Sequence, residues 1–77
     1  MNAHSEMSPY DPADETFSVA LSRAKAEFLE MPGLRLTLAQ AQRLWAFDRA
    51  LCDAVLATLV EARFLVQSRN ASFIRAD

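Results

Sequence analysis

The stretch LTLAQAQRLWAFDRALCDAVLATLVEARFLVQSRNASFIRA, from Leu36 to Ala76, decides the fold of this chain of 77 residues. It predicts a helix, a tight turn, a longer helix and a short hairpin. The first helix begins at Thr37, which has capping-box spacing with Gln40, so that each side chain satisfies a backbone amide at the helix start. The apolar residues that follow at helical spacing form its predicted inner face: Leu38, Ala41, Leu44 and Trp45. We expect Trp45 to anchor this helix against the preceding one and its indole N–H to find a hydrogen-bond partner.

The longer helix is predicted to begin after Asp48, because aspartate is a favourable N-cap. An apolar stripe that continues to about Arg63 predicts the buried face: Cys52, Val55, Leu56, Leu59 and Val60. Cys52, the only cysteine, lies inside this stripe and is interpreted as a small buried residue. The opposite, exposed face is predicted to carry Arg49, Ala50, Asp53, Ala54, Ala57, Thr58 and Glu61.

The last part of the stretch predicts a hairpin. Two runs rich in aromatic and β-branched residues, 64–68 and 72–76, flank Arg69-Asn70-Ala71. We expect Asn70 to tolerate the left-handed conformation that a tight turn needs. Arg63, Arg69 and Arg75 make the hairpin positive. Such arginines suit phosphates or a narrow minor groove, and they equally serve to keep an edge hairpin soluble.

A further helix is predicted upstream, over 17–30. Its core face shows spacings of four, three and four: Phe17, Leu21, Ala24 and Phe28. Residues 14–16 offer capping and favourable charge at its start, and Pro32-Gly33 ends it. The alternation in Leu34-Arg35-Leu36 suits a brief strand that pairs with the later hairpin.

Charge and length divide the chain into a tail and one small domain. Residues 1–16 hold four acids and no lysine or arginine, whereas 17–77 hold eight basic and six acidic residues. We predict a disordered acidic tail over 1–15 and a folded domain over 16–77. A domain of this size buries only about 60% of its unfolded surface, so a homodimer is a natural expectation. The sequence has no apolar run of about 18 residues and no secretory signal, so we expect a cytoplasmic protein without membrane contact.

The segments TLAQAQRLWAF, DRALCDAVLATLVEAR and FLVQSRNASFIR resemble the bacterial winged helix-turn-helix domains. The resemblance implies a mainly α fold with a small β-hairpin, namely a three-helix winged helix-turn-helix with residues 48–62 as recognition helix. Three positions depart from the pattern of the family. Ala46 stands where a turn glycine is frequent, Arg63 where glycine commonly ends the recognition helix, and Asn70-Ala71 where Asn-Gly or Asp-Gly is favoured.

The resemblance also implies a nucleic-acid site. It places Arg49, Ala50 and Asp53 at base edges and Arg69 on the wing near phosphate, and we add Arg43 and Arg75 as candidate contacts. Among the exposed residues of the recognition helix, only Arg49 is suited to paired hydrogen bonds with bases. The negative charge of Asp53 would be repelled by the phosphates that border the groove. We therefore predict a small DNA-binding protein of low specificity, a transcriptional regulator or accessory factor, which binds as a dimer.

A protein–protein interaction module without DNA binding is the alternative. In it, Ala50, Ala54 and Ala57 accept a partner helix closely. Convergence of Arg35, Arg43, Arg49, Arg69 and Arg75 on one face would favour DNA, whereas scattered arginines would favour the module.

Catalysis is not expected. The only histidine is His4 and the only glycine is Gly33, and we find no metal-ligand cluster, no glycine-rich phosphate loop and no nucleophile beside a base. The sequence accordingly predicts no catalytic, cofactor or metal site.

Overall fold

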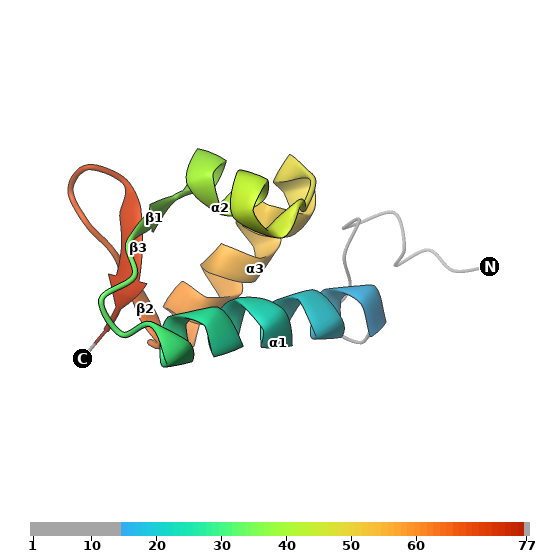
Figure 1. Ribbon diagram of the computed structural model, residues 1–77, viewed down its shortest axis with the longest axis horizontal. Coiled ribbons are helices and arrows are strands. Elements are labelled where there is room, and N and C mark those ends of the chain that lie inside the picture. The colour runs from blue at the N-terminus through green and yellow to red at the C-terminus, as the bar shows by residue number, and fades with distance from the viewer. Residues whose placement is uncertain (1–14, 77) are drawn as a thin grey trace.

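The computed structural model describes residues 15–76 (Figure 1). The predicted tail lies outside the described residues except for Glu15, which belongs to the first helix. Along the chain follow α1 (Glu15–Glu30), β1 (Leu36–Thr37), α2 (Leu38–Trp45), α3 (Arg49–Glu61), β2 (Leu65–Gln67) and β3 (Ser72–Arg75).

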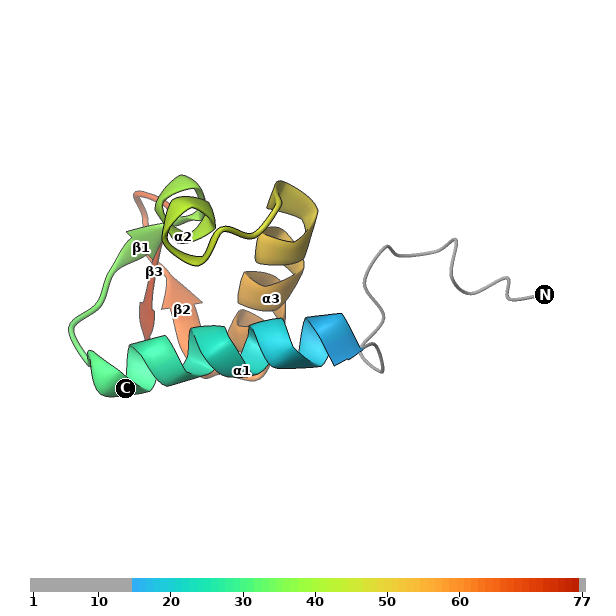
Figure 2. The ribbon, with the colours of Figure 1, turned by 45° about the vertical axis from the view of Figure 1, so that its right-hand side comes forward.

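Three helices and a small antiparallel sheet make up this part of the chain. The strand order is β1-β3-β2, so the hairpin strand β3 lies in the middle. Leu36 pairs with Phe73 on one side of β3, and Gln67 pairs with Phe73 on the other. Helix α1 runs along one side of the molecule, α2 lies on the opposite side, and α3 runs from beside α2 down to α1 (Figures 1 and 2). The mainly helical structure with a hairpin and a short earlier strand confirms the coarse prediction.

The earlier strand begins later than predicted. It spans Leu36–Thr37 rather than 34–36. The reason is local: the Leu34 amide donates to the Met31 carbonyl at 2.9 Å, so the chain is still completing the turn after α1. Pairing with β3 becomes available only once this turn has ended.

Helix α1 supplies one wall of the core. Phe17, Ala24 and Phe28 are buried as predicted, Ala20 joins them, and Leu21 is half-buried against the same cluster. These positions recur every three or four residues and therefore share one face of the helix. The periodic prediction for α1 is confirmed.

Helix α2 begins with the predicted capping box. The Thr37 hydroxyl accepts a hydrogen bond from the Gln40 amide at 3.2 Å, and the Gln40 side-chain oxygen accepts one from the Thr37 amide at 2.9 Å. Only Ala41 and Trp45 of this helix are fully buried. Leu44, predicted to face inward, is 47% exposed. Successive helical residues are about 100° apart, and the face centred on Ala41 and Trp45 leaves Leu44 to one side.

Trp45 anchors α2 to α1 as predicted. Its ring packs edge-to-face on Phe28 with the centroids 6.2 Å apart, and the centroid of the Phe47 ring lies 5.6 Å from that of Trp45. The expected partner of the indole is missing, however. Within the described residues, the buried Nε1 atom of Trp45 has no hydrogen-bond partner. That expectation was wrong: Trp45 is fully buried for its packing against the core, and its N–H stays unpaired.

Helix α3 is capped at both ends. An oxygen of Asp48 accepts from the Leu51 amide at 2.8 Å, which confirms the predicted N-cap. The helix ends at Glu61, one residue before the end of the recognition helix that the resemblance implies and two residues before the expected end of the apolar stripe. There the Phe64 amide donates to the Leu59 carbonyl and the Arg63 amide to the Val60 carbonyl, each at 2.9 Å. This pair of bonds is a Schellman motif, which requires a left-handed residue after the cap.

All three residues that depart from the family pattern have left-handed backbones. The φ angles are 57° at Ala46, 64° at Arg63 and 66° at Ala71. In the hairpin, the Ala71 amide donates to the Ser68 carbonyl at 3.0 Å, and Ala71 is the third residue of a three-residue loop. The left-handed position is therefore Ala71 and not Asn70, where we expected it.

We predict that glycine at each of these three positions stabilises the protein. A left-handed backbone costs a residue with a Cβ atom about 1 kcal/mol, and glycine removes this cost at the expense of a more flexible unfolded chain. Ala46→Gly, Arg63→Gly and Ala71→Gly should each raise the free energy of unfolding by about 0.5 kcal/mol or more in urea titrations. Ala57→Gly, at an exposed right-handed position of α3, is the control and should lower it by about 1 kcal/mol. Destabilisation by all three substitutions would contradict the left-handed assignment.

Cys52 is fully buried in α3, as predicted from the stripe. Burial raises the pKa of its thiol from 9.0 to about 11, and the carboxylates of Asp53 and Asp48 act in the same direction. The folded protein therefore holds the thiol neutral and disfavours the reactive thiolate.

The stability that the neutral thiol provides should disappear in alkali. The pKa is higher in the folded state, so this contribution is complete below pH 9.0 and declines as the pH rises through the folded value of about 11. We expect the thermal midpoint to fall more steeply over this range in the parent than in Cys52→Ala. We also expect the native thiol to react with a disulfide reagent only after denaturant is added. Rapid labelling of the native protein at pH 8 would contradict the burial.

Candidate nucleic-acid interface

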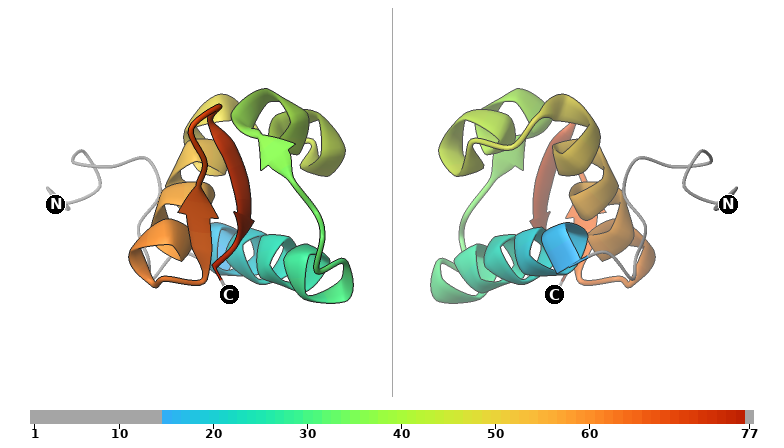
Figure 3. Two further views of the ribbon diagram at one scale, coloured as in Figure 1. Left: turned by 90° about the vertical axis from the view of Figure 1, so that its left-hand side faces the viewer. Right: turned by 90° about the vertical axis from the view of Figure 1, so that its right-hand side faces the viewer.

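The starts of α2 and α3 and the tip of the hairpin lie at the same end of the molecule, away from α1 (Figure 3). Between them is a shallow hollow. Its lining comes from α2, α3 and the hairpin, together with the residue before α2: Thr37, Leu38, Ala39, Gln42, Arg49, Asp53, Gln67, Ala71 and Phe73. Segments distant in sequence thus form one concave surface.

Three donor side chains from three elements line this hollow. Arg49 is the first residue of α3, Gln42 lies on α2 and Gln67 on β2. Arg49 is exposed, and within residues 15–76 no hydrogen bond or ion pair engages its guanidinium group. Guanidinium and amide groups are the side chains that make paired hydrogen bonds to base edges.

The two glutamines were not among the predicted site residues. No pattern in the sequence singled out either Gln42 or Gln67 as a site residue. The register of the hairpin explains why Gln67 belongs here: it pairs with Phe73, which also lines the hollow. This placement follows only from the pairing of β3 with both neighbours.

Asp53 limits the positive charge of the hollow. It lies one turn further along α3 than Arg49 and lines the same surface. A carboxylate at this place repels phosphate and offsets the charge of Arg49. Ala50, the third predicted base-edge position, is exposed beside them and offers only a methyl group.

Arg69 is exposed at the hairpin tip, whose turn is held by side-chain hydrogen bonds. The Ser68 hydroxyl donates to the side-chain oxygen of Asn70 at 2.6 Å, and the Ser72 amide donates to the Ser68 hydroxyl at 3.3 Å. These contacts restrict the loop that carries Arg69. The tip therefore presents its positive charge from an ordered turn.

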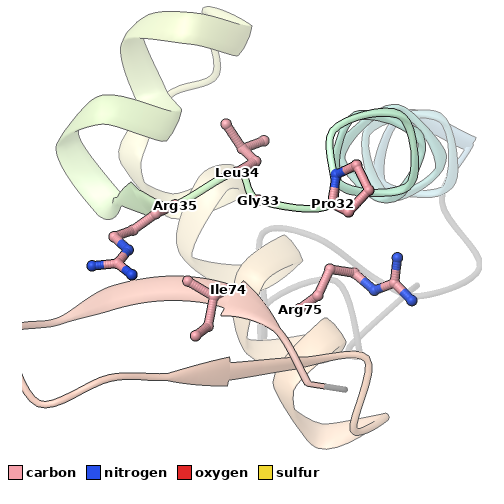
Figure 4. A pocket seen from close by; sticks show the side chains of 6 residues that line it. All are labelled: Pro32, Gly33, Leu34, Arg35, Ile74 and Arg75. Atoms are coloured by element: carbon pink, nitrogen blue, oxygen red, sulfur yellow. The ribbon is translucent and has the colours of Figure 1, made fainter.

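Arg75 lies at the other end of β3. It pairs with Leu65, and its guanidinium carbon lies 5.1 Å from the centroid of the Phe64 ring. A separate pocket of about 330 Å³ is lined by Arg75 and Arg35, whose guanidinium groups point to opposite sides (Figure 4). Arg75 lies three positions after Ser72, a distance of about 10 Å along a strand. The structure therefore does not bring Arg75 together with Arg69.

Arg43 lies on the outer side of α2. It is exposed, and it lines one shallow pocket with Gln42 and Phe47 and another with Arg35 and Leu44. The arginines named in the sequence thus share no single hollow. Arg49 and Arg69 belong to the end with the hairpin tip, and Arg75 lies at the last residue of β3, whereas Arg35 lines pockets with both Arg43 and Arg75.

The small-residue face of α3 is narrower than predicted. Ala50 and Ala57 are exposed, but Ala54 is half-buried and packs against the core. The Thr58 hydroxyl also folds back onto this side and donates to the Ala54 carbonyl at 2.7 Å. Asp53 stands between the two exposed alanines along the helix.

Two further findings concern the described part of the chain. No three residues of the histidine, cysteine, aspartate and glutamate types gather closely enough in it to hold a metal ion. None of its helices combines the length and the apolar character needed to cross a bilayer. Compared with models of known protein families, with curated proteins and with solved structures, the chain shows no match.

Proposed function

We propose that this protein is a small winged helix-turn-helix domain that binds DNA with low sequence specificity, as a regulator or accessory factor. The order α1-β1-α2-α3-β2-β3 and the sheet order β1-β3-β2 support this architecture. The observation that carries the functional part is the hollow in which Gln42, Arg49 and Gln67 meet, with Arg69 exposed on the hairpin beside it.

In this proposal the start of α3 enters the major groove. Arg49 reaches base edges or the phosphate beside them, and the two glutamines add hydrogen bonds from the neighbouring elements. The backbone amides at the starts of α2 and α3 carry partial positive charge, which favours a phosphate near that end. Arg69 contacts the backbone or the minor groove from the hairpin.

Low specificity follows from the residues further along α3. Asp53 and Glu61 oppose deep insertion because both repel phosphate, and the exposed alanines offer no hydrogen bond. Each protomer neutralises few phosphates, so affinity is modest and falls with salt. Binding by a dimer would double the number of phosphate contacts.

A protein-interaction module remains the second candidate, and the separation of the arginines into distinct groups favours it. The exposed Ala50 and Ala57 would then receive a partner helix. Ala57→Arg is a sharper probe of this surface than a change at Ala54, because Ala54 packs against the core. Loss of a protein association in Ala57→Arg, together with the absence of DNA binding by the parent, would favour the module.

We predict that Arg49 and Arg69 carry DNA binding and that Arg75 does not. In fluorescence anisotropy with a mixed-sequence duplex at low salt, Arg49→Ala and Arg69→Ala should each weaken binding by about fivefold or more. Arg69→Ala should also lower the salt slope by about one. Arg75→Ala removes the same charge from the base of the sheet and is the matched control, with little expected effect.

Two results would contradict the proposal. One is the absence of binding by the parent protein at a concentration on the order of tens of micromolar, where non-specific association is normally detected. The other is an equal loss of affinity in all three variants. Such a loss would indicate that net charge alone, and not the hollow with its hairpin, determines binding.

A further inference from the structure

Helix α2 borders a second hollow, on a different side from the hollow that contains Arg49. This second hollow, which we call the α2 groove, has a volume of about 530 Å³. One of its walls is α2, and the other is the segment that follows α1 and leads into β1. None of its lining residues lines the hollow of Arg49. The two surfaces are therefore separate, and α2 contributes to both.

The floor of the α2 groove is apolar. Four apolar side chains line it: Met31, Leu34, Leu36 and Leu44. Leu36 is buried, but Met31 is 44% exposed and Leu44 is 47% exposed. Figure 4 shows the Leu34 side chain pointing away from Ile74 and toward α2. Leu44 thus has the helical spacing of a core residue and the exposure of a surface residue.

Two arginines, Arg35 and Arg43, border this apolar floor. Both are exposed, and no acidic residue lines the groove with them. Within residues 15–76, no hydrogen bond, ion pair or ring contact engages either guanidinium group. Glu27 and Glu30, on the last turn of α1, lie outside the lining. The groove therefore combines an apolar floor with two unpaired positive charges.

We infer that the α2 groove binds an acidic amphipathic helix of another protein. Apolar side chains at helical spacing would cover Met31 and Leu44. Carboxylates beside them would form hydrogen-bonded ion pairs with Arg35 and Arg43. Helix α2 has eight residues and is about 12 Å long, so about two to three turns of a partner helix match its length.

Charge and apolar character together select this partner. The phosphates of a nucleic acid would suit the two arginines, but they would lie against an apolar floor that offers them no hydrogen bond. An uncharged apolar helix would leave both guanidinium groups without a counter-charge. A second copy seated groove to groove would bring arginine against arginine, which is unfavourable. A segment that is both acidic and apolar meets both requirements.

An NMR titration of the isotope-labelled full chain tests this inference. The probe is a synthetic amphipathic helix of about 12 residues made of leucine, alanine and glutamate, and its counterpart carries lysine in place of glutamate. The glutamate peptide should bind with a Kd on the order of 100 micromolar and shift the amide signals of residues 31–36 and 40–44. The lysine peptide should bind at least about tenfold more weakly.

Variants of the groove should change the affinity for the glutamate peptide. Leu44→Glu should weaken binding by at least about tenfold and Arg43→Ala by about fivefold. Arg69→Ala removes the same charge from the hairpin tip and is the matched control, with no expected effect. The double substitution Arg35→Glu with Arg43→Glu should reverse the preference, so that the lysine peptide binds at least about tenfold more tightly than the glutamate peptide. All these positions are exposed, so the circular dichroism of each variant should match that of the parent.

Two results would show that the groove recognises no acidic helix. One is the absence of binding by the glutamate peptide at a concentration on the order of a millimolar. The other is an equal loss of affinity in Arg43→Ala and Arg69→Ala, which would make net charge the only cause of binding. The titration contains no nucleic acid, so this inference and the proposed DNA binding fail separately.

Three other results would assign the groove to a different occupant and would equally overturn the inference. Self-association of the parent that Leu44→Glu abolishes would indicate a second copy. Peptide binding that appears only after the acids of residues 1–14 are changed to amides would indicate the chain's own N-terminal residues. Loss of duplex binding in Arg43→Ala, with unchanged peptide binding, would indicate nucleic acid.

Discussion

The edge-to-face contact between Trp45 and Phe28 is the interaction on which the rest of the structure depends. It joins the end of α2 to the last turn of α1, and because α3 begins only four residues after Trp45, it also fixes where α3 starts. The buried indole N–H without a partner costs about 1–3 kcal/mol. Burial of the whole aromatic ring outweighs this cost. The starts of α2 and α3 line the hollow. Their positions thus depend on the contact between Trp45 and Phe28, which lies away from the hollow.

The local features of the fold could be predicted from the sequence because their causes lie within a few residues. The capping box at Thr37 and the N-cap at Asp48 each depend on a partner three positions away. The buried faces of α1 and α3 follow from helical spacing over several turns. Arg63 and Ala46 were identified as positions that favour glycine, and both have left-handed backbones.

The remaining features depend on tertiary packing, which no local pattern encodes. Leu44 fits an inward helical spacing, but α2 has only eight residues and its burial is decided by the single large side chain of Trp45. Arg75 and Arg69 appear together as hairpin charges, yet the length of β3 separates them. Gln67 joins Arg49 only through the pairing of the strands. The sequence could therefore predict the kind of candidate site. Which residues line it depends on how the strands of the sheet pair.

The chain's single glycine, Gly33, occupies open space, with no heavy atom within 4 Å of where a Cβ would lie. The three left-handed turns are made instead by alanine and arginine. In the denatured ensemble, alanine and arginine rarely adopt the left-handed conformation. The turns before and after α3 are therefore seldom formed in the unfolded chain. Docking of the helices must impose them. The three left-handed residues thus add a conformational cost that the packing of the helices and of the sheet offsets in the folded state.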